Sequence, residues 1–327
     1  MASIRYRSKK WQARVSRKGQ QSLVKTFRTK EDAERWARSI EVEWDKGTYT
    51  NLHQVQKTIF GELIERYIRE VTPTMRGAKE DTIRLKAILR RPITKVNLLL
   101  LNSSRIAQYR DERLKEVLPA TVIRELAYFS SIINHARREW GINIPNPVLL
   151  VRKPPSPPGR NRILSKDEEL QLLEASKAKA NRNIYTYPFI VLALETAMRR
   201  GELLGLRWEH INFSKQTAHL PLTKNGESRI VPLSKKALET LQALPRSIDG
   251  RVLPVNFAAL ENNFKRARIR ANIKDLRIHD LRHSAITRLA EKLPNLLELS
   301  AVTGHKQLTM LKRYYHPNPE MLAQKLG

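Results

Sequence analysis

Apolar and polar residues alternate over residues 11–16, as they do in a short strand with one buried face, and residues 22–27 form a second short strand-like run. A helical pattern follows, in which apolar residues recur at helical spacing as far as Trp44. It begins at Thr29, which is followed three positions later by an acidic residue and so matches a capping box. The pattern predicts a small sheet backed by one helix within residues 1–50.

The next region is helical throughout. In the segments 58–71 and 121–140 the apolar residues fall on one face of each helix. We find no set of residues here that suggests catalysis. The pattern predicts a helical domain over residues 56–150, with basic surface side chains suited to holding a duplex backbone.

The segment 151–162, VRKPPSPPGRNR, contains four prolines among arginine and lysine residues. Proline lacks a backbone donor and restricts the residue before it, so this segment cannot continue a helix. We expect a stiff, extended and positively charged linker. After it, Ser165 and Glu168 have the spacing of a capping box, which predicts the start of another domain over residues 163–327.

Charged residues interrupt an apolar helical pattern at residues 189–211. The interruption consists of Arg199, Arg200 and Glu202. A guanidinium beside an apolar stripe is costly to bury unless a partner compensates its charge. These residues therefore indicate a site and not only a core.

A hairpin is predicted at residues 218–233, where two strand-like runs meet at Asn225 and Gly226. This dipeptide is the strongest signal for a tight hairpin turn. Lys224 comes immediately before the turn, where it can enter a groove or a site. Taken alone, a solvated turn lysine would be the more ordinary interpretation.

Length and composition narrow the class of protein. The 327 residues exceed what one hydrophobic core needs, so we expect a multidomain protein, mainly helical with small β-sheets. Lys and Arg number 61 against 32 Asp and Glu, and the usual partner of such an excess is a polyanion. The sequence has no cysteine, no signal-peptide pattern and no apolar run near the roughly 18 residues of a membrane span. We therefore expect an intracellular protein without disulfides or cysteine-ligated zinc.

The first thirty residues hold ten Lys and Arg and no acidic residue. Like charges at this density repel one another unless an anion meets them, so a DNA-binding module is favoured over a solvated basic edge. The side chains expected to contact DNA are Arg5, Arg7, Lys9, Lys10, Arg14, Lys18 and Lys25.

Two further stretches carry unusual residues. In RIHDLRHSAIT, His279 and Arg282 share one helix face, and His283 follows His279 by four positions. Histidines at this spacing can ligate a metal, but Arg282 lies between them, so recognition of an anion fits better. Farther on, His305 precedes two adjacent tyrosines in TGHKQLTMLKRYYHP.

Five motifs in this order, ETAMRRGELLGLRW, TKNGESRIVPL, HDLRH, TGH and RYYHP, resemble the catalytic domain of the phage-integrase, or tyrosine recombinase, family. The resemblance covers about residues 163–318 and implies a mixed α+β catalytic domain. The helical region before it is similar to the core-binding domain of that family, and residues 1–50 are similar to its arm-type DNA-binding modules. The implied catalytic residues are Arg199, Lys224, His279, Arg282, His305 and Tyr314, with Glu202 in support.

The resemblance also implies roles. Tyr314 would attack the scissile phosphate and form a 3′-phosphotyrosyl link, and Lys224 would protonate the leaving 5′ oxygen. The two arginines and His305 would stabilise the negative charge of the transition state. His279 would assist positioning or proton transfer. The covalent link conserves the phosphodiester energy, so no cofactor or metal is expected.

The choice between the tyrosines follows from the family spacing. The nucleophile lies nine residues after the GH histidine and two before another histidine, which selects Tyr314 over Tyr315. Ala197 departs from the pattern, because the family commonly has glycine at that position. No chemical group is missing, so the resemblance implies a competent enzyme.

The expected partner is double-stranded DNA at specific recombination sites, bound by a homotetramer that forms a Holliday junction, with possible accessory DNA-bending proteins. The expected location is the prokaryotic cytoplasm, in association with the nucleoid. Some phrases of the sequence are similar to shufflon-type DNA invertases, so inversion stands as an alternative to integration. Basic charge and this set of residue types also fit a type IB topoisomerase or a non-catalytic DNA-binding protein.

Overall fold

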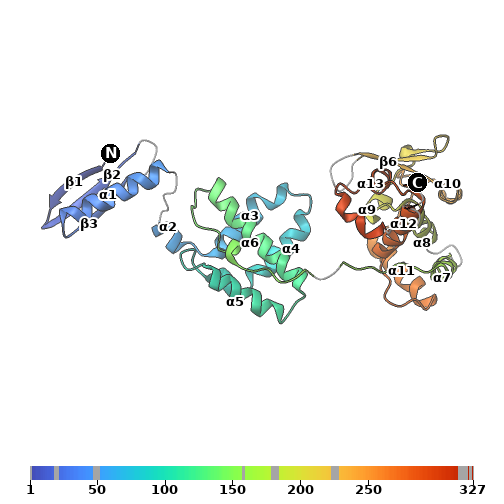
Figure 1. Cartoon of the computed structure of the whole chain (residues 1–327), viewed down its shortest axis with the longest axis horizontal. Coiled ribbons are helices and arrows are strands. Elements are labelled where there is room, and N and C mark those ends of the chain that lie inside the picture. The colour runs from blue at the N-terminus through green and yellow to red at the C-terminus, as the bar shows by residue number, and fades with distance from the viewer. Residues whose placement is uncertain are drawn as a thin grey trace. The chain divides into compact units, whose positions relative to one another are not determined.

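A computed structural model describes most of the chain, and it divides into two compact units, Met1–Pro158 and Gly159–Gly327. Each unit is described by itself. The chain is mainly helical with small antiparallel sheets (Figure 1). The described residues are 2–17, 22–46, 52–156, 159–177, 184–221, 228–315, 323 and 326, with the backbone alone for 52–54.

The first unit begins with a three-stranded antiparallel sheet and a helix. The predicted strands and helix are confirmed, and an N-terminal strand that we did not predict precedes them. The Thr29 side chain accepts from the backbone N–H of Asp32 at 3.2 Å, so the helix starts where the capping spacing indicated. The elements are β1 (Ala2–Arg7), β2 (Lys10–Val15), β3 (Leu23–Phe27) and α1 (Lys30–Asp45).

The strand register divides the sheet into two faces. Ala13 and Val15 are buried in one core cluster with apolar residues of α1, so their face is covered by the helix. The other face carries polar and basic residues. From the pairings Ser3↔Arg14, Arg5↔Gln12, Arg7↔Lys10 and Gln12↔Thr26, this open face includes Arg5, Arg7, Lys10 and Arg14.

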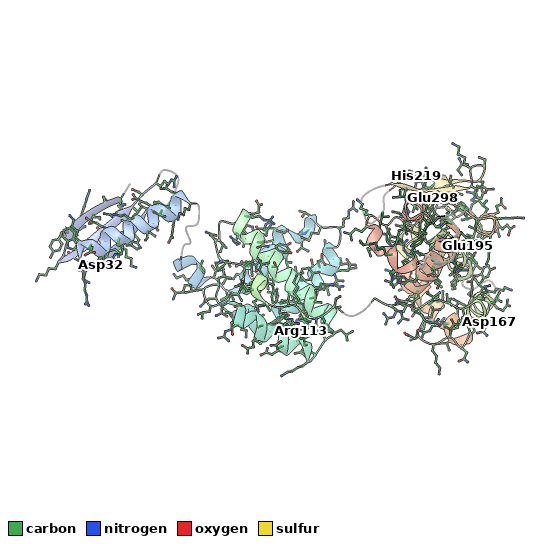
Figure 2. All side chains as sticks on the ribbon, in the orientation of Figure 1. Asp32, Arg113, Asp167, Glu195, His219 and Glu298 are labelled. Atoms are coloured by element: carbon green, nitrogen blue, oxygen red, sulfur yellow. The ribbon has the colours of Figure 1, made fainter. Side chains whose placement is uncertain are left out.

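The rest of the first unit is helical, as predicted. Its core is aromatic at the centre, where Phe60 and Phe129 pack edge to face with ring centroids 5.0 Å apart. Arg113, labelled in Figure 2, pairs with the carboxylate of Glu125 through two nitrogens, at 3.0 and 2.7 Å. The helices are α2 (Leu52–Lys57), α3 (Phe60–Glu70), α4 (Ala78–Leu89), α5 (Ser103–Leu114) and α6 (Pro119–Glu139), with 3-10 turns η1 (Thr72–Thr74), η2 (Pro92–Lys95) and η3 (Pro147–Leu150).

The second unit combines helices with a small antiparallel sheet of order β4-β5-β6. Its helices are α7 (Lys166–Ser176), α8 (Thr186–Thr196), α9 (Arg200–Leu204), α10 (Lys235–Gln242), α11 (Phe257–Arg270), α12 (Ile278–Lys292) and α13 (Leu296–Thr303). Its strands are β4 (Ile211–Asn212), β5 (Thr217–Leu220) and β6 (Arg229–Pro232), and its 3-10 turns are η4 (Trp208–His210), η5 (Leu308–Met310) and η6 (Lys312–Tyr314). The capping box of Ser165 and Glu168 at the start of α7 is confirmed.

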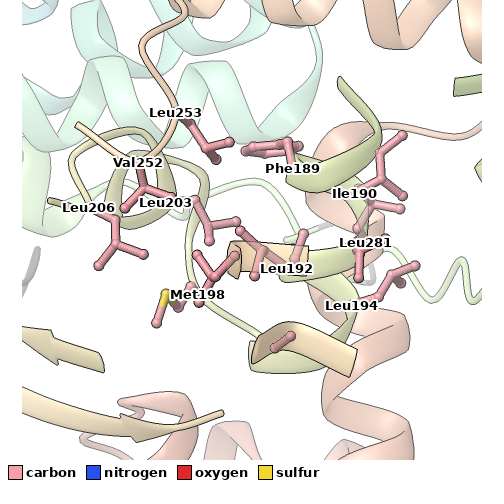
Figure 3. Packing of buried hydrophobic residues seen from close by; sticks show 14 of the residues in the cluster. Phe189, Ile190, Leu192, Leu194, Met198, Leu203, Leu206, Val252, Leu253 and Leu281 are labelled. Carbon is pink, nitrogen blue, oxygen red and sulfur yellow. The ribbon is translucent and has the colours of Figure 1, made fainter. Parts of the chain in front are cut away.

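Helix α8 lies in the middle of the main core. It is apolar on nearly every side, which is typical of a helix surrounded by its own domain. Figure 3 shows its side chains packed with residues of the following turns and of α12. The labelled residues are Phe189, Ile190, Leu192, Leu194, Met198, Leu203, Leu206, Val252, Leu253 and Leu281.

The pattern at residues 189–211 is not one helix. Helix α8 ends at Thr196, Ala197 takes left-handed angles with φ 51°, and Arg199 is extended before α9 begins. The left-handed residue stops the helix and turns the chain sharply. This break directs Arg199 away from the axis of α8, so the charged residues mark the end of a buried helix and not an interruption within it.

The predicted strand pair is confirmed, with His219 opposite Ile230 and Leu220 opposite Arg229. The expected turn and Lys224 lie in 222–227, outside the described residues. Among the helices that the structure describes, none is long and apolar enough to cross a membrane.

Candidate active site

Glu202 holds Arg199 at the start of α9. The backbone N–H of Arg199 donates to Glu202 Oε2 at 2.8 Å, and its Nη1 donates to Oε1 at 2.9 Å. Its Nη2 reaches the carbonyl oxygen of Gly304 at 3.1 Å. The neighbouring Arg200 instead stacks on the ring of Phe257, 3.6 Å from the centroid. Of the two adjacent arginines, Arg199 is therefore the one that joins the Gly304 turn.

Glu202 also binds a second arginine, Arg229, which the sequence interpretation missed. Arg229, the first residue of β6, donates from Nη1 and Nη2 to the two oxygens of Glu202 at 3.0 and 2.7 Å. Burial raises the pKa of the Glu202 carboxyl, but the hydrogen bonds from Arg229 and Arg199 outweigh it and hold the pKa below its usual range. A signal was present, because Arg229 is two residues from the buried Val231 and so lies on the core face of its strand.

Arg282 is buried on α12, with 4% of its surface exposed. Its Nη1 donates to the carbonyl of Ala197, and its Nη2 donates to that of Thr303 at 2.7 Å. Both acceptors are neutral. Burial, and then the charge of Arg199, lower the pKa of Arg282 to about 9, so it remains a cation near pH 7. The nearby charge of Glu202 opposes this shift. A buried cation that bonds to neutral carbonyl oxygens and faces a second cation favours the approach of an anion.

The turn after α13 brings these groups together. Consecutive carbonyls, those of Thr303 and Gly304, accept from Arg282 and Arg199 respectively. His305 follows directly. Gly304 has φ 69°, and a Cβ at this position would collide with the guanidinium of Arg229. The turn therefore requires glycine for both its backbone angles and its space.

His305 is fixed by Thr303. The Thr303 hydroxyl donates to the carbonyl of Leu299 at 2.7 Å and lies 2.8 Å from His305 Nδ1. Because the hydroxyl has one proton, we assign the hydrogen of the second contact to Nδ1, which leaves Nε2 free to act toward a ligand. Burial, and then the charges of Arg282 and Arg199, lower the pKa of His305 to about 4. A bound phosphate would offset these charges and favour the protonated ring, in which Nε2 carries a hydrogen that it can donate to a phosphate oxygen.

Tyr314 is the last residue of η6 and lies next to α12. Its hydroxyl is hydrogen-bonded to Nδ1 of His283, and the two rings are stacked with centroids 5.9 Å apart. Burial raises the pKa of Tyr314, although Arg313 and Arg282 oppose the effect. The sequence interpretation noted the position of His283 without giving it a role. Its spacing from His279 was the available signal.

His279 lies one turn before His283 on α12, and their rings meet edge to face at 5.0 Å. It is more exposed than His283. Burial and the charge of Arg282 lower its pKa. Among the described residues, no group of three His, Cys, Asp or Glu side chains is placed to hold a metal ion.

The end of the predicted linker contacts the site. Arg160 Nε donates to both oxygens of Asp280 at 2.9 and 3.0 Å, and Asp280 is buried one residue after His279. The carbonyl of Arg160 and the side chain of Asn161 both accept from Arg313 Nη2 at 2.6 Å. Residues 160 and 161 thus tie the first turn of α12 to the residue before Tyr314.

The predicted DNA contacts lie in the first unit. Arg5, Arg7, Lys10 and Arg14 share the open face of the sheet, while Lys9 is in the turn between β1 and β2. Lys25 lies opposite Ala13, and its ammonium is 5.5 Å from the centroid of the Phe27 ring. Lys18, like Lys224 and His316, is outside the described residues.

The second unit therefore brings a phenol, two arginines and three imidazoles into one region. The arginines can bind the non-bridging oxygens of a phosphodiester, and the phenol can attack its phosphorus. Of the predicted catalytic residues, five are brought to this region: Arg199, His279, Arg282, His305 and Tyr314.

Comparisons with known proteins agree with this geometry. A model of the phage integrase family matches residues 162–321. A shufflon-specific DNA recombinase of Escherichia coli is 41% identical over 84% of this chain and 73% of its own length. A putative integrase/recombinase of Haemophilus influenzae is 36% identical over 97% of this chain and 88% of its own.

Solved structures share the fold. A lambda integrase tetramer bound to a Holliday junction aligns with a TM-score of 0.66 at 21% identity, over 96% of this chain and 94% of that one. The Tn1549 transposon integrase, in complex with circular intermediate DNA, aligns with a TM-score of 0.65 at 18% identity, over 83% and 100% of the respective chains. With relatives of this identity and coverage, the chain belongs to the phage integrase family of tyrosine-type site-specific DNA recombinases.

Proposed function

We propose that this recombinase cleaves and rejoins DNA through Tyr314, which forms a 3′-phosphotyrosyl link and releases a 5′ hydroxyl. One observation carries the proposal: the buried Arg282 and the half-buried Arg199 bond to the consecutive carbonyls of Thr303 and Gly304, beside His305. A scissile phosphate would supply the anion that this cationic turn favours.

The remaining roles follow the family motifs. Arg199, Arg282 and His305 stabilise the charge of the pentavalent phosphorus, and Glu202 holds the first arginine in place. Lys224 is the general acid for the leaving 5′ oxygen. The two strands of its hairpin support this role, because their last pair includes Arg229, which is bonded to Glu202.

The catalytic proposal is tested by trapping adducts on DNA. The purified protein is incubated with fragmented DNA of its source organism, denatured in detergent, and the bound fragments are sequenced. We expect adducts at recurrent sequences, and none from Tyr314→Phe. Adducts at unrelated sequences, with relaxation of any supercoiled plasmid, would favour a type IB topoisomerase. Absence of adducts on DNA that the protein binds would favour a non-catalytic protein.

We assign residues 1–50 to an arm-type DNA-binding module, 56–150 to a core-binding domain, 151–162 to the linker and 163–327 to the catalytic domain. The open basic face of the N-terminal sheet supports the first assignment, because a flat array of arginine and lysine can follow phosphates. Replacing Arg5 by alanine should reduce the salt dependence of DNA binding by about one unit of slope if that residue contacts a phosphate.

Inversion of DNA segments is the second candidate for the biological reaction. It is supported by the shufflon-specific recombinase, which is 41% identical to this chain. A plasmid with two recovered sites in inverted orientation, and one with the sites in direct orientation, separates the candidates. Inversion alone would support a shufflon-type enzyme, whereas joining of sites on separate molecules would support an integrase.

We further propose that four protomers act together on crossed DNA strands, with accessory DNA-bending proteins at some sites. A structural neighbour, lambda integrase, is described as a tetramer bound to a Holliday junction. Because the substrate is DNA, we place the enzyme with the nucleoid in a prokaryotic cytoplasm. Mass measurement of the protein on a synthetic four-way junction tests the assembly.

A further inference from the structure

The Tyr314 phenol must lose a proton when it attacks phosphorus. Burial raises its pKa, and the nearby charges of Arg313 and Arg282 only partly oppose this. The Tyr314 phenol is therefore protonated at neutral pH. A group within hydrogen-bond distance of its oxygen must accept that proton during the attack.

The hydrogen bond of the phenol identifies such a group. Tyr314 Oη is bonded to Nδ1 of His283, and the rings are stacked at an interplanar angle of 28°. His283 is held rigidly, because it lies within α12 between the buried residues Arg282 and Ser284. His279 meets the ring of His283 edge to face, and the contact to the phenol oxygen comes from His283.

We propose that His283, and not His279, is the general base that accepts the Tyr314 proton during strand cleavage. This inference rests on the proposed role of Tyr314 as the nucleophile. In the step, Oη forms a bond to phosphorus, the bond from phosphorus to O5′ breaks, and the Oη proton moves to Nδ1 of His283. The leaving O5′ takes its proton from the general acid. On rejoining, His283 returns its proton to Oη as the 5′ hydroxyl attacks.

The environment of His283 keeps its imidazole unprotonated at neutral pH, so that the ring can accept a proton. Burial, then the charges of His279 and Arg313, lower its pKa to about 4, with a smaller effect of Arg282 in the same direction and an opposing effect of Asp280. Its ring is therefore neutral near pH 7. With the proton on Nε2, Nδ1 has a free lone pair facing the phenol. The negative charge of a bound phosphate would offset the surrounding cations and make the imidazolium easier to form.

The test separates proton transfer from positioning. Asparagine has its amide oxygen near the place of Nδ1, so His283→Asn can keep a hydrogen bond to Tyr314 but cannot accept a proton at neutral pH. The assay is single-turnover adduct formation on a nicked suicide substrate carrying a recovered site. We expect His283→Asn to lose on the order of 10²-fold in rate at pH 7. The matched control is His279→Asn, for which we expect a smaller loss.

Two readouts would not change if His283 had only a structural role. The rate of His283→Asn should rise more steeply with pH than that of the wild type, because hydroxide must replace the lost base. Placing 3-fluorotyrosine at position 314, which makes the phenol more acidic, should recover part of the lost rate in His283→Asn. Recovery by fluorotyrosine in His279→Asn instead would overturn the proposal and assign the base to His279.

A wild-type rate for His283→Asn would also overturn the proposal. DNA binding and thermal unfolding of each variant are measured in parallel, and His283→Gln is examined by the same criteria if the asparagine variant does not fold. The outcomes for the nucleophile remain separate. If Tyr314→Phe still forms an adduct, the proposed function fails, whereas a Tyr314 adduct formed at full rate without His283 refutes only the base.

Discussion

Arg229 and Glu202 form a bidentate ion pair, with nitrogen–oxygen distances of 3.0 and 2.7 Å. Both side chains are nearly buried, with 9% and 7% of their surfaces exposed. Because Glu202 also binds Arg199, the pair joins strand β6 to the first arginine of the site. The strand that follows the predicted Lys224 turn is therefore coupled to the arginines of the proposed site.

Loss of Arg229 should disable the site without removing a group that touches DNA. Arg229→Ala leaves the buried Glu202 with one cation fewer, and removal of one partner of a buried pair costs about 3–5 kcal/mol. We expect lower stability and at least tenfold slower adduct formation. Arg229→Lys should recover part of the stability but not the fork geometry. The control is Ile230→Ala, an exposed neighbour on the same strand. Normal cleavage by Arg229→Ala would contradict this coupling.

Arg160 should matter more for cleavage than its position in the predicted linker suggests. It binds the buried Asp280, and its carbonyl accepts from Arg313, the residue before Tyr314. We expect Arg160→Ala to slow adduct formation about tenfold or more, because a shift of the reacting groups by about 1 Å can cost 10²-fold. DNA affinity should change much less.

Arg162→Ala is the matched control for Arg160. Arg162 pairs with Glu168 at the start of α7 and has no role in the contact with Arg313 or Asp280 that we describe. Both variants remove one positive charge from the same segment. Equal cleavage rates for the two variants would show that charge alone matters and would refute the positioning role.

Glycine should be tolerated at position 197 although the methyl group there is buried. A left-handed non-glycine residue costs about 1–2 kcal/mol, which Ala197→Gly would relieve. The change loses about 0.8 kcal/mol of burial and about 0.5–1 kcal/mol of chain entropy. We expect a net change in unfolding free energy below about 1 kcal/mol, with activity retained.

The control for Ala197 is Ala193→Gly, at a buried position inside α8. There the helix gains nothing from glycine, so propensity and burial add to a loss of about 2 kcal/mol. Urea unfolding of both variants measures the contrast. If Ala197→Gly destabilises the protein as much as Ala193→Gly, the left-handed turn is not strained as we describe.

Acid should destabilise the catalytic unit through its histidines. The pKa values of His283 and His305 are about 4 in the folded protein, against an ordinary value of 6.5. The unfolded chain therefore binds more protons between these values, so stability present above pH 6.5 is lost as the pH falls toward 4. Each pKa unit is worth about 1.4 kcal/mol, and partial exposure of the rings reduces this, so we expect a combined loss of about 2–4 kcal/mol.

Pulse proteolysis in urea measures this loss. The amount of the protected fragment that spans Gly159–Gly327 gives the folded fraction of the second unit. The double variant His283→Asn, His305→Asn should have a flatter dependence on pH between 6.5 and 4.5. The double variant should keep a small dependence of stability on pH, because the pKa of His279 is also lowered. An unchanged slope in the double variant would contradict the assignment to these two rings.

Local patterns predicted most of the fold. The capping residues Thr29 and Ser165 mark the starts of α1 and α7, and apolar spacing predicted the faces of α1, α3 and α6. Strand β1 was not predicted, because only Ile4 and Tyr6 alternate with the charged Arg5 and Arg7, and so short an alternation is a weak strand signal. The break at residue 197 is indicated by the glycine that the family commonly has there, because alanine carries no turn signal of its own.

The site was predicted where it follows sequence motifs and missed where it depends on tertiary contacts. The family resemblance predicted Arg199, Arg282, His305 and Tyr314 because each motif is local, and the structure brings these four residues to one region. Alternation with Val231 indicates that Arg229 lies on the core face of its strand, but its partner Glu202 lies on another element, so the ion pair could not be assigned. The contact of His283 with Tyr314 likewise spans 31 positions of the chain, which no spacing rule covers.

The most direct test of the account locates the DNA on the protein. The adduct formed on a suicide substrate is digested with nuclease and trypsin, and the modified peptide is sequenced by mass spectrometry. Cleavage after Arg313 releases a peptide that begins with the two tyrosines, so its first fragment ion distinguishes them. The account predicts the nucleotide on Tyr314, and a nucleotide on Tyr315 would contradict it.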